Sequence, residues 1–212
     1  MAVLLYPTYT GAHQLGINVP HHFTRITEVL LGFQVIFRLT GSVTATEART
    51  VLEDAVAMKP RVLMFVYCGH GRDNPKMGER VRSQHGTLCL SNGVLSEDDI
   101  VAALGGFSGT LIRFLNMCSA GPLQPQASNA ALQSDPDLGW GTQGQVHNAP
   151  CAFKTVNFFS SINSKKVCPL DADKMLEAFV NAAGKDYATL RESWPGWEMA
   201  ESYSGKFPGV AV

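Results

Sequence analysis

The chain of 212 residues predicts an α/β protein, a three-layer α-β-α sandwich with a mostly parallel sheet at its centre. Strand-like apolar segments alternate with helix-like segments, which is the order expected when helices connect parallel strands. The segment RVLMFVYC at 61–68 is apolar on both of its faces. A strand of that kind needs helices covering both sides of its sheet, as in a parallel sheet between two helical layers.

Helices and strands are placed from apolar periodicity and from the residues that begin or end them. Strands are expected at 2–6, 33–39, 61–68, 86–90, 110–117 and 155–161. Helices are expected at 21–31, 44–58, 96–104 and 171–184. The segments 72–86 and 121–150 are expected to be loops, and no pattern places the tail at 185–212.

Particular residues support the helix assignments. Gly32 is the expected C-terminal signal of the first helix. Thr44 and Glu47 match a capping box at the start of the second helix, and Ser96 is expected to cap the third. The second helix is expected to bury one apolar stripe, formed by Val51, Leu52, Ala55, Val56 and Met58.

Charge and cysteine content limit the partners and the compartment. The chain has 17 Lys and Arg against 18 Asp and Glu, so it offers no electrostatic reason to bind nucleic acid or an anionic membrane. The N-terminus MAVLLYPTYTG has no basic region, and we expect neither a signal peptide nor a membrane span. The five cysteines are odd in number and contain no CxxC pair. We therefore expect reduced thiols and a cytoplasmic location.

The apolar strand at 61–68 is followed by a histidine between two glycines, Gly69-His70-Gly71. Open α/β sheets carry their reaction sites at the carboxyl ends of their strands, so His70 lies where chemistry is expected. Glycines on either side permit a sharp turn and close approach of the backbone to a ligand. Without a partner, such a histidine is more often a hydrogen-bonded loop residue than a catalyst.

The strand at 110–117 supplies the partner, because it is followed at once by Cys118 in NMCSAG. Adjacent parallel strands end at the same edge, so His70 and Cys118 are expected to meet there. A cysteine thiol needs a nearby base to become a nucleophilic thiolate, and an imidazole provides one and can later protonate a leaving amine. The backbone N–H groups of Gly71 and Cys118 are the expected oxyanion donors.

VYCGHG and NMCSAG, with His70 of the first motif 48 residues before Cys118 of the second, resemble the caspase–metacaspase family of cysteine peptidases. The order of the predicted elements over about residues 1–183 is also similar to that family. The resemblance implies a caspase-like fold in a single domain spanning 1–212. It also implies a large-subunit-like part at 1–121, a linker at 122–150 and a small-subunit-like part at 151–212.

The specificity residues depart from the family pattern. Asn116 stands where metacaspases have an Asp that binds a basic P1 side chain and caspases have a Gln. Asn116, Ser160 and Lys165 are nevertheless the residues that the resemblance assigns to substrate binding. A neutral Asn116 weakens basic-P1 specificity, so Asp at P1 is slightly favoured over Arg or Lys. Lys165 and its neighbour Lys166 either pair with an acidic P1 side chain or are solvated surface residues.

The predicted linker contains no Lys or Arg, because none lies between Arg113 and Lys154. An enzyme specific for basic residues has no site there to cut itself. Asp135 is followed by a proline, so Asp137 is the candidate for self-cleavage. The alternative is that the linker is never cut.

The resemblance implies a Cys–His endopeptidase acting through an acyl-enzyme on protein or peptide substrates, in cell death or stress signalling. The alternative is a caspase-fold decoy or adaptor that binds a peptidase or its substrate. The resemblance to caspases leaves both a monomer and a homodimer open. No cofactor or metal is expected, and calcium activation, known in some metacaspases, has no EF-hand pattern to support it.

The adjacent histidines His21 and His22 make a poor metal pair, and they are expected to be a solvated helix start.

Overall fold

The structure is a computed structural model that describes residues 1–34, 36–73, 86–117, 154–159, 172–186, 189–190, 198–199 and 206–210. Its helices are α1 (Val19–Val29), α2 (Ala45–Ala57), α3 (Glu97–Ala103) and α4 (Ala172–Ala182), with a short 3-10 turn η1 (Gly11–His13). Its strands are β1 (Ala2–Pro7), β2 (Ile36–Gly41), β3 (Val62–Cys68), β4 (Gly71–Asp73), β5 (Gly86–Leu90), β6 (Gly93–Leu95), β7 (Thr110–Asn116), β8 (Lys154–Phe159) and β9 (Glu198–Met199).

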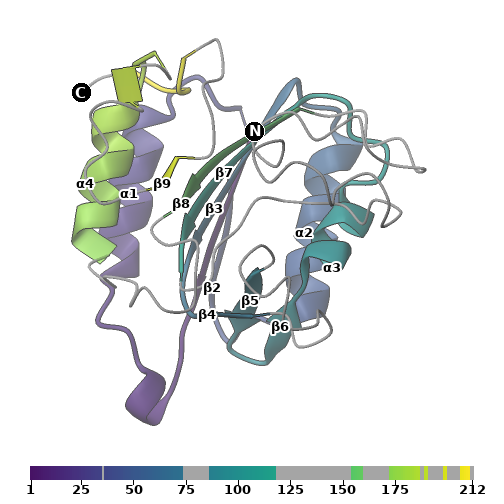
Figure 1. The fold of residues 1–212 in the computed structure, drawn as a ribbon, viewed down its shortest axis with the longest axis vertical. Helices are drawn as coiled ribbons and strands as arrows, with labels where there is room; N and C mark the ends of the chain where they lie inside the picture. Colours follow the sequence, from purple (N-terminus) through teal and green to yellow (C-terminus); the bar gives the residue numbers. More distant parts are fainter. Residues whose placement is uncertain are drawn as a thin grey trace, which may run out of the picture.

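The described strands form a central sheet and a smaller one. The central sheet has the order β2-β1-β3-β7-β8-β9, in which only β9 pairs antiparallel. Helices α1 and α4 cover one face of this sheet, and α2 and α3 cover the other (Figure 1). Strands β4, β5 and β6 form an antiparallel sheet of their own. The predicted three-layer α-β-α sandwich with a mostly parallel sheet is therefore confirmed.

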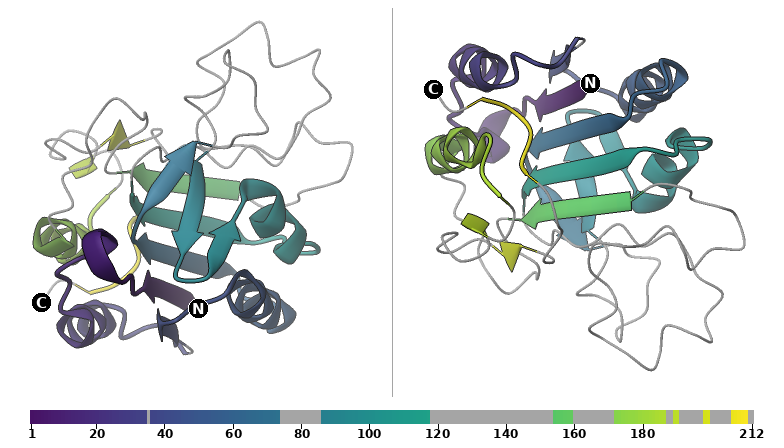
Figure 2. Two further views of the ribbon diagram at one scale, coloured as in Figure 1. Left: turned by 90° about the horizontal axis from the view of Figure 1, so that it is seen from below. Right: turned by 90° about the horizontal axis from the view of Figure 1, so that it is seen from above.

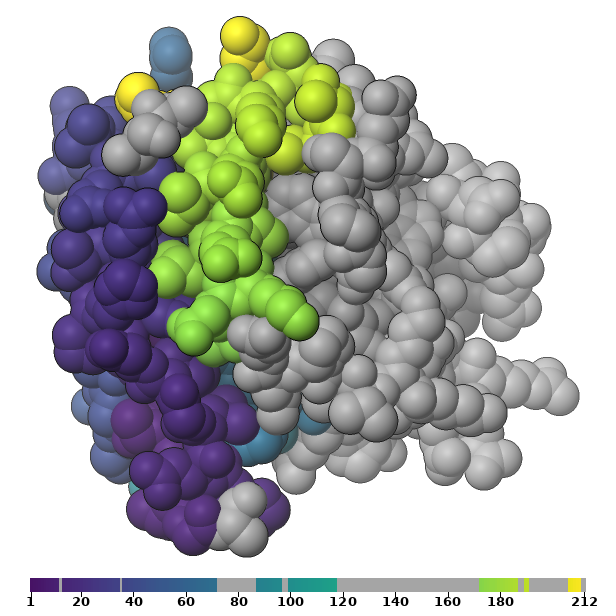
Figure 3. Space-filling model, turned by 90° about the vertical axis from the view of Figure 1, so that its left-hand side faces the viewer, coloured from purple at the N-terminus to yellow at the C-terminus, as the bar shows by residue number. Residues whose placement is uncertain are grey.

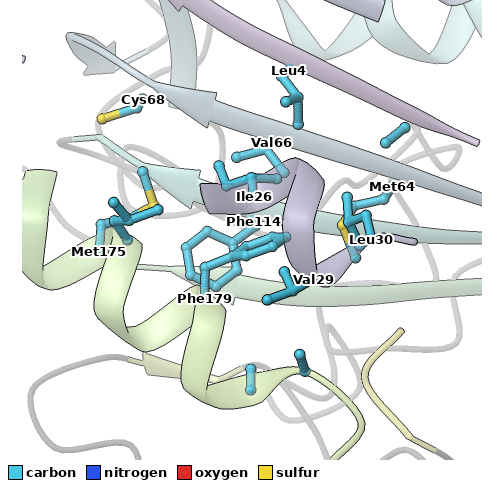
Figure 4. Close-up of a cluster of buried hydrophobic side chains, with 14 of the residues drawn as sticks. Leu4, Ile26, Val29, Leu30, Met64, Val66, Cys68, Phe114, Met175 and Phe179 are labelled. Atoms are coloured by element: carbon cyan, nitrogen blue, oxygen red, sulfur yellow. The ribbon is translucent and has the colours of Figure 1, made fainter. Parts of the chain in front are cut away.

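The core lies on both faces of the central sheet, because side chains of successive strand residues point to opposite sides. One set packs under α1 and α4, where Val66, Phe114 and Phe179 meet (Figure 4). The other set packs under α2 and α3, where Phe65, Leu52 and other apolar side chains meet. Strand β3 is buried along both sides, as its continuous apolar sequence predicts.

Helix α1 begins at Val19, two residues before the predicted start at 21. The side chain of Asn18 accepts a hydrogen bond from the His21 N–H, and Pro20 lies in the first turn, where a missing N–H costs nothing. The helix also ends early, at Val29, and a turn joins it to β2, which starts at Ile36 rather than at the predicted 33.

The burial of His22 overturns the prediction that His21 and His22 form a solvated helix start. His21 is exposed, but His22 is fully buried against the sheet. Its Nδ1 lies 3.4 Å from the hydroxyl oxygen of Tyr6, and its Nε2 lies 3.3 Å from a carboxylate oxygen of Asp173 on α4. Burial lowers the pKa of His22, and the Asp173 carboxylate opposes that shift. His22 therefore belongs to the packing between α1 and α4.

Helix α2 starts with the predicted capping box: the Thr44 hydroxyl accepts from the Glu47 N–H, and the Glu47 carboxylate accepts from the Thr44 N–H. Ala48, Leu52 and Ala55 are its buried residues, and Val51 and Val56 are partly buried beside them. The assignment of Met58 to the buried stripe was wrong, because α2 ends at Ala57 and the Met58 side chain is 53% exposed.

Two further segments differ from the sequence-based expectation. Arg72 and Asp73 were expected to begin a loop, but with Gly71 they form β4, which pairs with β5. Part of the unplaced tail, residues 206–210, contributes to the core: the buried Phe207 ring packs edge-on against Phe114 and Phe179. The Val210 N–H donates to the carbonyl of Val29, so this segment helps hold the C-terminal end of α1.

Helices α1 and α4 lie side by side on one outer face of the molecule (Figure 3). Across the part of the chain that the structure describes, every helix is too short or too polar to cross a lipid bilayer.

Candidate active site

The site begins where β3 and β7 leave the sheet. These strands are parallel neighbours, and Cys68 at the end of β3 lies opposite Asn116 at the end of β7. The Gly69 N–H extends the ladder by donating to the Asn116 carbonyl over 3.1 Å. The predicted adjacency of the two strands is thus confirmed up to their last residues. η1 and the β4–β6 sheet lie at the same end of the molecule (Figures 1 and 2).

The structure describes three of the predicted site residues: His70, Gly71 and Asn116. The candidate nucleophile Cys118 lies one residue beyond Met117, where the described segment ends. Ser160, Lys165 and the self-cleavage candidate Asp137 also lie outside the described residues.

The orientation of the His70 ring is set by the segment that follows β1. Its Nε2 lies 2.8 Å from the carbonyl oxygen of His13, at the end of η1. A carbonyl only accepts hydrogen bonds, so Nε2 carries the proton of the neutral ring and Nδ1 carries the lone pair. The ring therefore has one nitrogen fixed in a hydrogen bond and the other available to accept a proton.

The backbone of His70 is held by two tyrosine hydroxyls. The His70 N–H donates to the Tyr9 hydroxyl oxygen over 2.9 Å, and the Tyr67 hydroxyl donates to the His70 carbonyl over 2.6 Å. The Tyr9 hydroxyl in turn donates to the carbonyl of Cys89 on β5 over 2.6 Å. The Tyr9 ring also packs edge-on against the His70 ring, with centroids 4.5 Å apart.

Both tyrosines remain neutral hydrogen-bond donors in ordinary buffers. Burial raises the pKa of Tyr9 to about 12 and raises the pKa of the fully buried Tyr67 well above its usual value of 10. Sequence reasoning missed these two residues. Tyr67 was part of the quoted VYCGHG segment, but nothing in the spacing distinguishes its hydroxyl from an ordinary core tyrosine.

The glycines on either side of His70 serve different purposes. A Cβ on Gly69 would lie 2.5 Å from the Tyr9 hydroxyl oxygen and 2.6 Å from that of Tyr67, so only glycine fits between the two hydroxyls. Gly71 begins β4, opposite Leu88. Because the Cys89 N–H bonds the carbonyl of His70, Gly71 and Leu88 form a non-hydrogen-bonded pair. The Gly71 N–H therefore points away from β5, as an oxyanion donor requires.

Asn116 lies at the end of β7 with its side chain fully buried. Its amide nitrogen donates to the sulfur of Cys68 over 3.4 Å. Cys68 is itself 1% exposed and belongs to the core. The role of Asn116 in substrate binding stays a prediction.

A pocket of about 390 Å³ opens beside His70. Its walls come from the segments that follow β1 and β2, from the β5–β6 turn and from His70 itself. The described residues that line it are Thr8, Tyr9, Thr10, His13, Ser42, His70, Cys89, Leu90 and Ser91. These nine are rich in hydroxyl groups, and none of them is Asp, Glu, Lys or Arg. Among the described residues, no group of three or more His, Cys, Asp or Glu side chains is arranged to hold a metal ion.

Searches against family models and against curated protein sequences find no match to this chain. Among solved structures, the chain is similar to the crystal structure of caspase-1 from Spodoptera frugiperda, with a TM-score of 0.50 and 14% sequence identity. The similarity covers 91% of this chain and 73% of that one. The fold is caspase-like. At this level of identity the similarity shows the fold, and the chemistry must be argued from the site residues.

Proposed function

We propose that the protein is a caspase-like cysteine endopeptidase in which His70 and Cys118 form the catalytic dyad. One observation carries the proposal: the His70 ring, with Nε2 held by the His13 carbonyl, follows a strand whose parallel neighbour leads directly into Cys118. The caspase-like fold supports it, because a base and a thiol at the ends of adjacent strands are arranged for acyl transfer.

The proposed reaction uses Nδ1 of His70 as the base, because Nε2 is committed to the His13 carbonyl. Nδ1 takes the thiol proton of Cys118, and the sulfur attacks the peptide carbonyl carbon to form a tetrahedral intermediate. The N–H groups of Gly71 and Cys118 bind its oxyanion. The intermediate collapses as Nδ1 returns the proton to the leaving amine. Water, deprotonated by the same nitrogen, then hydrolyses the thioester and releases the free enzyme.

Substrate selection is assigned to Asn116, Ser160 and Lys165, with Asp at P1 slightly favoured over Arg or Lys. Asn116 carries no charge that could pair with a buried basic side chain. If the linker at 122–150 is cut, the cut follows Asp137. Intact-protein mass spectrometry of wild type and Asp137→Ala tests this, and a cut at another position contradicts it. Cell death or stress signalling is the proposed setting.

The test of the proposed activity is cleavage of a fluorogenic peptide library varied at P1, with and without calcium. Wild type and Cys118→Ala are compared at equal concentration, with circular dichroism confirming that both are folded. We expect wild type to cleave after one class of residue and Cys118→Ala to cleave nothing. Cleavage that persists in Cys118→Ala, or a folded wild type that cleaves no member, contradicts the peptidase assignment.

The second candidate is a caspase-fold decoy or adaptor that binds a peptidase or its substrate. The burial of Asn116 favours it, because a fully buried neutral amide offers neither charge nor exposed surface to a P1 side chain. The same library decides between the two, since a decoy leaves every peptide intact in both proteins.

A further inference from the structure

We propose that Tyr9 and Tyr67 are positioning residues that hold His70 in the orientation required for proton transfer. This inference rests on the proposed function and deepens it. The two hydroxyls are 3.1 Å apart and lie directly against the backbone of His70. We call this arrangement the tyrosine clamp, meaning the Tyr9 and Tyr67 hydroxyls with the His70 and Cys89 backbone groups that they bind.

In the clamp, each hydroxyl proton and the His70 N–H proton has an acceptor. Each hydroxyl carries one proton, and two carbonyls, those of His70 and Cys89, lie within 2.6 Å of a tyrosine oxygen. The assignment in which Tyr67 donates to His70 and Tyr9 donates to Cys89 satisfies both carbonyls. It leaves the Tyr9 oxygen free to accept the His70 N–H. Both the N–H and the carbonyl of the base are thus bound by tyrosine side chains.

The clamp joins segments that are far apart in the sequence. Tyr9 follows β1, Tyr67 belongs to β3, and Cys89 belongs to β5. His13, which binds Nε2 of His70, also comes from the segment after β1. The position of the base is therefore set by three separate parts of the fold rather than by its own strand alone.

His70 needs such restraint because of its neighbours. Glycines precede and follow it, and a glycine backbone has more accessible conformations than that of any other residue. Without further contacts, the Gly69-His70-Gly71 segment would sample many orientations of the ring. Gly69 also has to be a glycine for the clamp to exist, since a Cβ there would meet both hydroxyls. Gly69 makes the backbone more flexible, but it also leaves room for the two tyrosine hydroxyls, whose hydrogen bonds hold His70 in place.

Positioning of this kind affects the rate more than binding. Displacing a catalytic group by about 1 Å can cost on the order of 100-fold in rate. Tyr9 supplies two contacts to His70, a hydrogen bond and an edge-on ring contact. Replacing Tyr9 with phenylalanine removes the hydroxyl while keeping the ring, so the hydrogen bond can be tested separately.

The test compares Tyr9→Phe, Tyr67→Phe and the double variant with wild type, using the best peptide of the P1 library. The matched control is Tyr6→Phe, because Tyr6 is as buried as Tyr67 and its hydroxyl faces His22 rather than His70. We expect each clamp variant to lower kcat by about 10- to 100-fold with little change in KM. The double variant should lose less than the product of the two, because residues acting as a unit are not additive. Tyr6→Phe should stay within about twofold of wild type.

A second readout follows the His70 ring without any substrate. Nitrogen-15 NMR of the histidine side chains distinguishes the two neutral tautomers, and His70→Gln identifies the signals of His70. We expect wild type to show the tautomer protonated at Nε2, and the clamp variants to show a mixture of both. Thermal unfolding confirms that each variant is folded. If Tyr67→Phe does not fold, the less buried Tyr9→Phe decides alone.

The outcomes separate the two proposals. A lowered kcat with mixed tautomers in the clamp variants supports the clamp. An unchanged kcat and a single tautomer in folded clamp variants overturn it while leaving the peptidase assignment intact. If wild type cleaves nothing but the tautomer changes as expected, the clamp holds the ring and the peptidase assignment is the part that fails.

Discussion

The carboxyl ends of β3 and β7 lie side by side, but they are held in different ways. At the β3 end, His70 is only partly buried and is fixed by hydrogen bonds to the Tyr67 hydroxyl of β3 itself and to the Tyr9 hydroxyl and His13 carbonyl of the segment after β1. At the β7 end, Asn116 and Met117 are fully buried within the core. The proposed base is therefore positioned by directional contacts, whereas the segment that leads to the proposed nucleophile is positioned by packing.

This difference has a consequence for substitutions. Removing the His70 side chain at the β3 end should affect catalysis more than stability, because that side chain lies outside the apolar core. Changes at the β7 end should affect stability first, because nothing there can move without disturbing the core. Four predictions test the contrast.

The largest effect is expected from His70→Ala. Loss of the base should lower kcat/KM by about 10²- to 10⁴-fold, which is the usual contribution of a general acid–base group. The melting temperature should stay close to that of wild type, because His70 lies outside the apolar core. Steady-state kinetics and thermal unfolding measure the two quantities. His21→Ala, at an exposed histidine, is the control and should change neither. Equal activity in the two variants would remove His70 from the dyad.

The β7 end is tested by Asn116→Asp, which keeps the shape of the side chain and replaces its amide with a carboxyl group. Burial disfavours the charged carboxylate, so its pKa should rise above the ordinary value of about 4. The free energy of unfolding should fall by on the order of 3 kcal/mol at pH 7.5 and by less at pH 5, where the carboxyl is more readily protonated.

Urea unfolding at both pH values measures this, with Asn92→Asp at an exposed turn as the control. The control should stay within about 0.5 kcal/mol of wild type. An Asn116→Asp protein as stable as wild type at pH 7.5 would show that this end is not closely packed.

Gly69→Ala tests the close approach at the β3 end. The added Cβ would lie within 2.6 Å of both tyrosine hydroxyl oxygens, so the backbone or the rings must move. We expect a loss of about 1–3 kcal/mol in the free energy of unfolding, the usual range for overpacking, together with a lower kcat. Gly32→Ala is the matched control, because nothing lies within 4 Å of its added Cβ. If both substitutions have the same small effect, the hydroxyls are not in contact with Gly69.

The smallest expected effect is on the free energy of unfolding at alkaline pH. The pKa of Tyr9 is about 12 in the folded protein, against an ordinary value of 10. The unfolded chain therefore loses this proton at lower pH than the folded one. The stabilisation is fully present below pH 10 and is lost as the pH rises toward 12. Unfolding midpoints measured across this range should fall less steeply in Tyr9→Phe than in wild type. Identical slopes would mean that Tyr9 ionises as freely in the fold as in the unfolded chain.

The fold class was predictable because its main signal is local. A continuous apolar strand such as 61–68 fits only a sheet covered on both faces, and the capping box at Thr44 and Glu47 marks a helix start directly. The placement of His70 at a strand end next to the strand preceding Cys118 follows from the same signal.

The errors arose where tertiary contacts decide. His22 lies on the buried face of α1, and its ring meets Tyr6 on β1 and Asp173 on α4, which are far away in the sequence. Phe207 completes the core from a tail without periodicity. Tyr9 meets His70 across 61 positions of sequence, and no local pattern can report such a contact.

The central claim is that His70 and Cys118 act as a pair, and covalent labelling tests it most directly. The protein is incubated with a peptidyl acyloxymethyl ketone that carries the P1 residue preferred in the library, and the modified residue is located by mass spectrometry. We expect one label per chain, on Cys118, with its rate of formation strongly reduced in His70→Ala and unchanged in His21→Ala. A label on another cysteine, or one that forms equally fast in His70→Ala, would contradict the account.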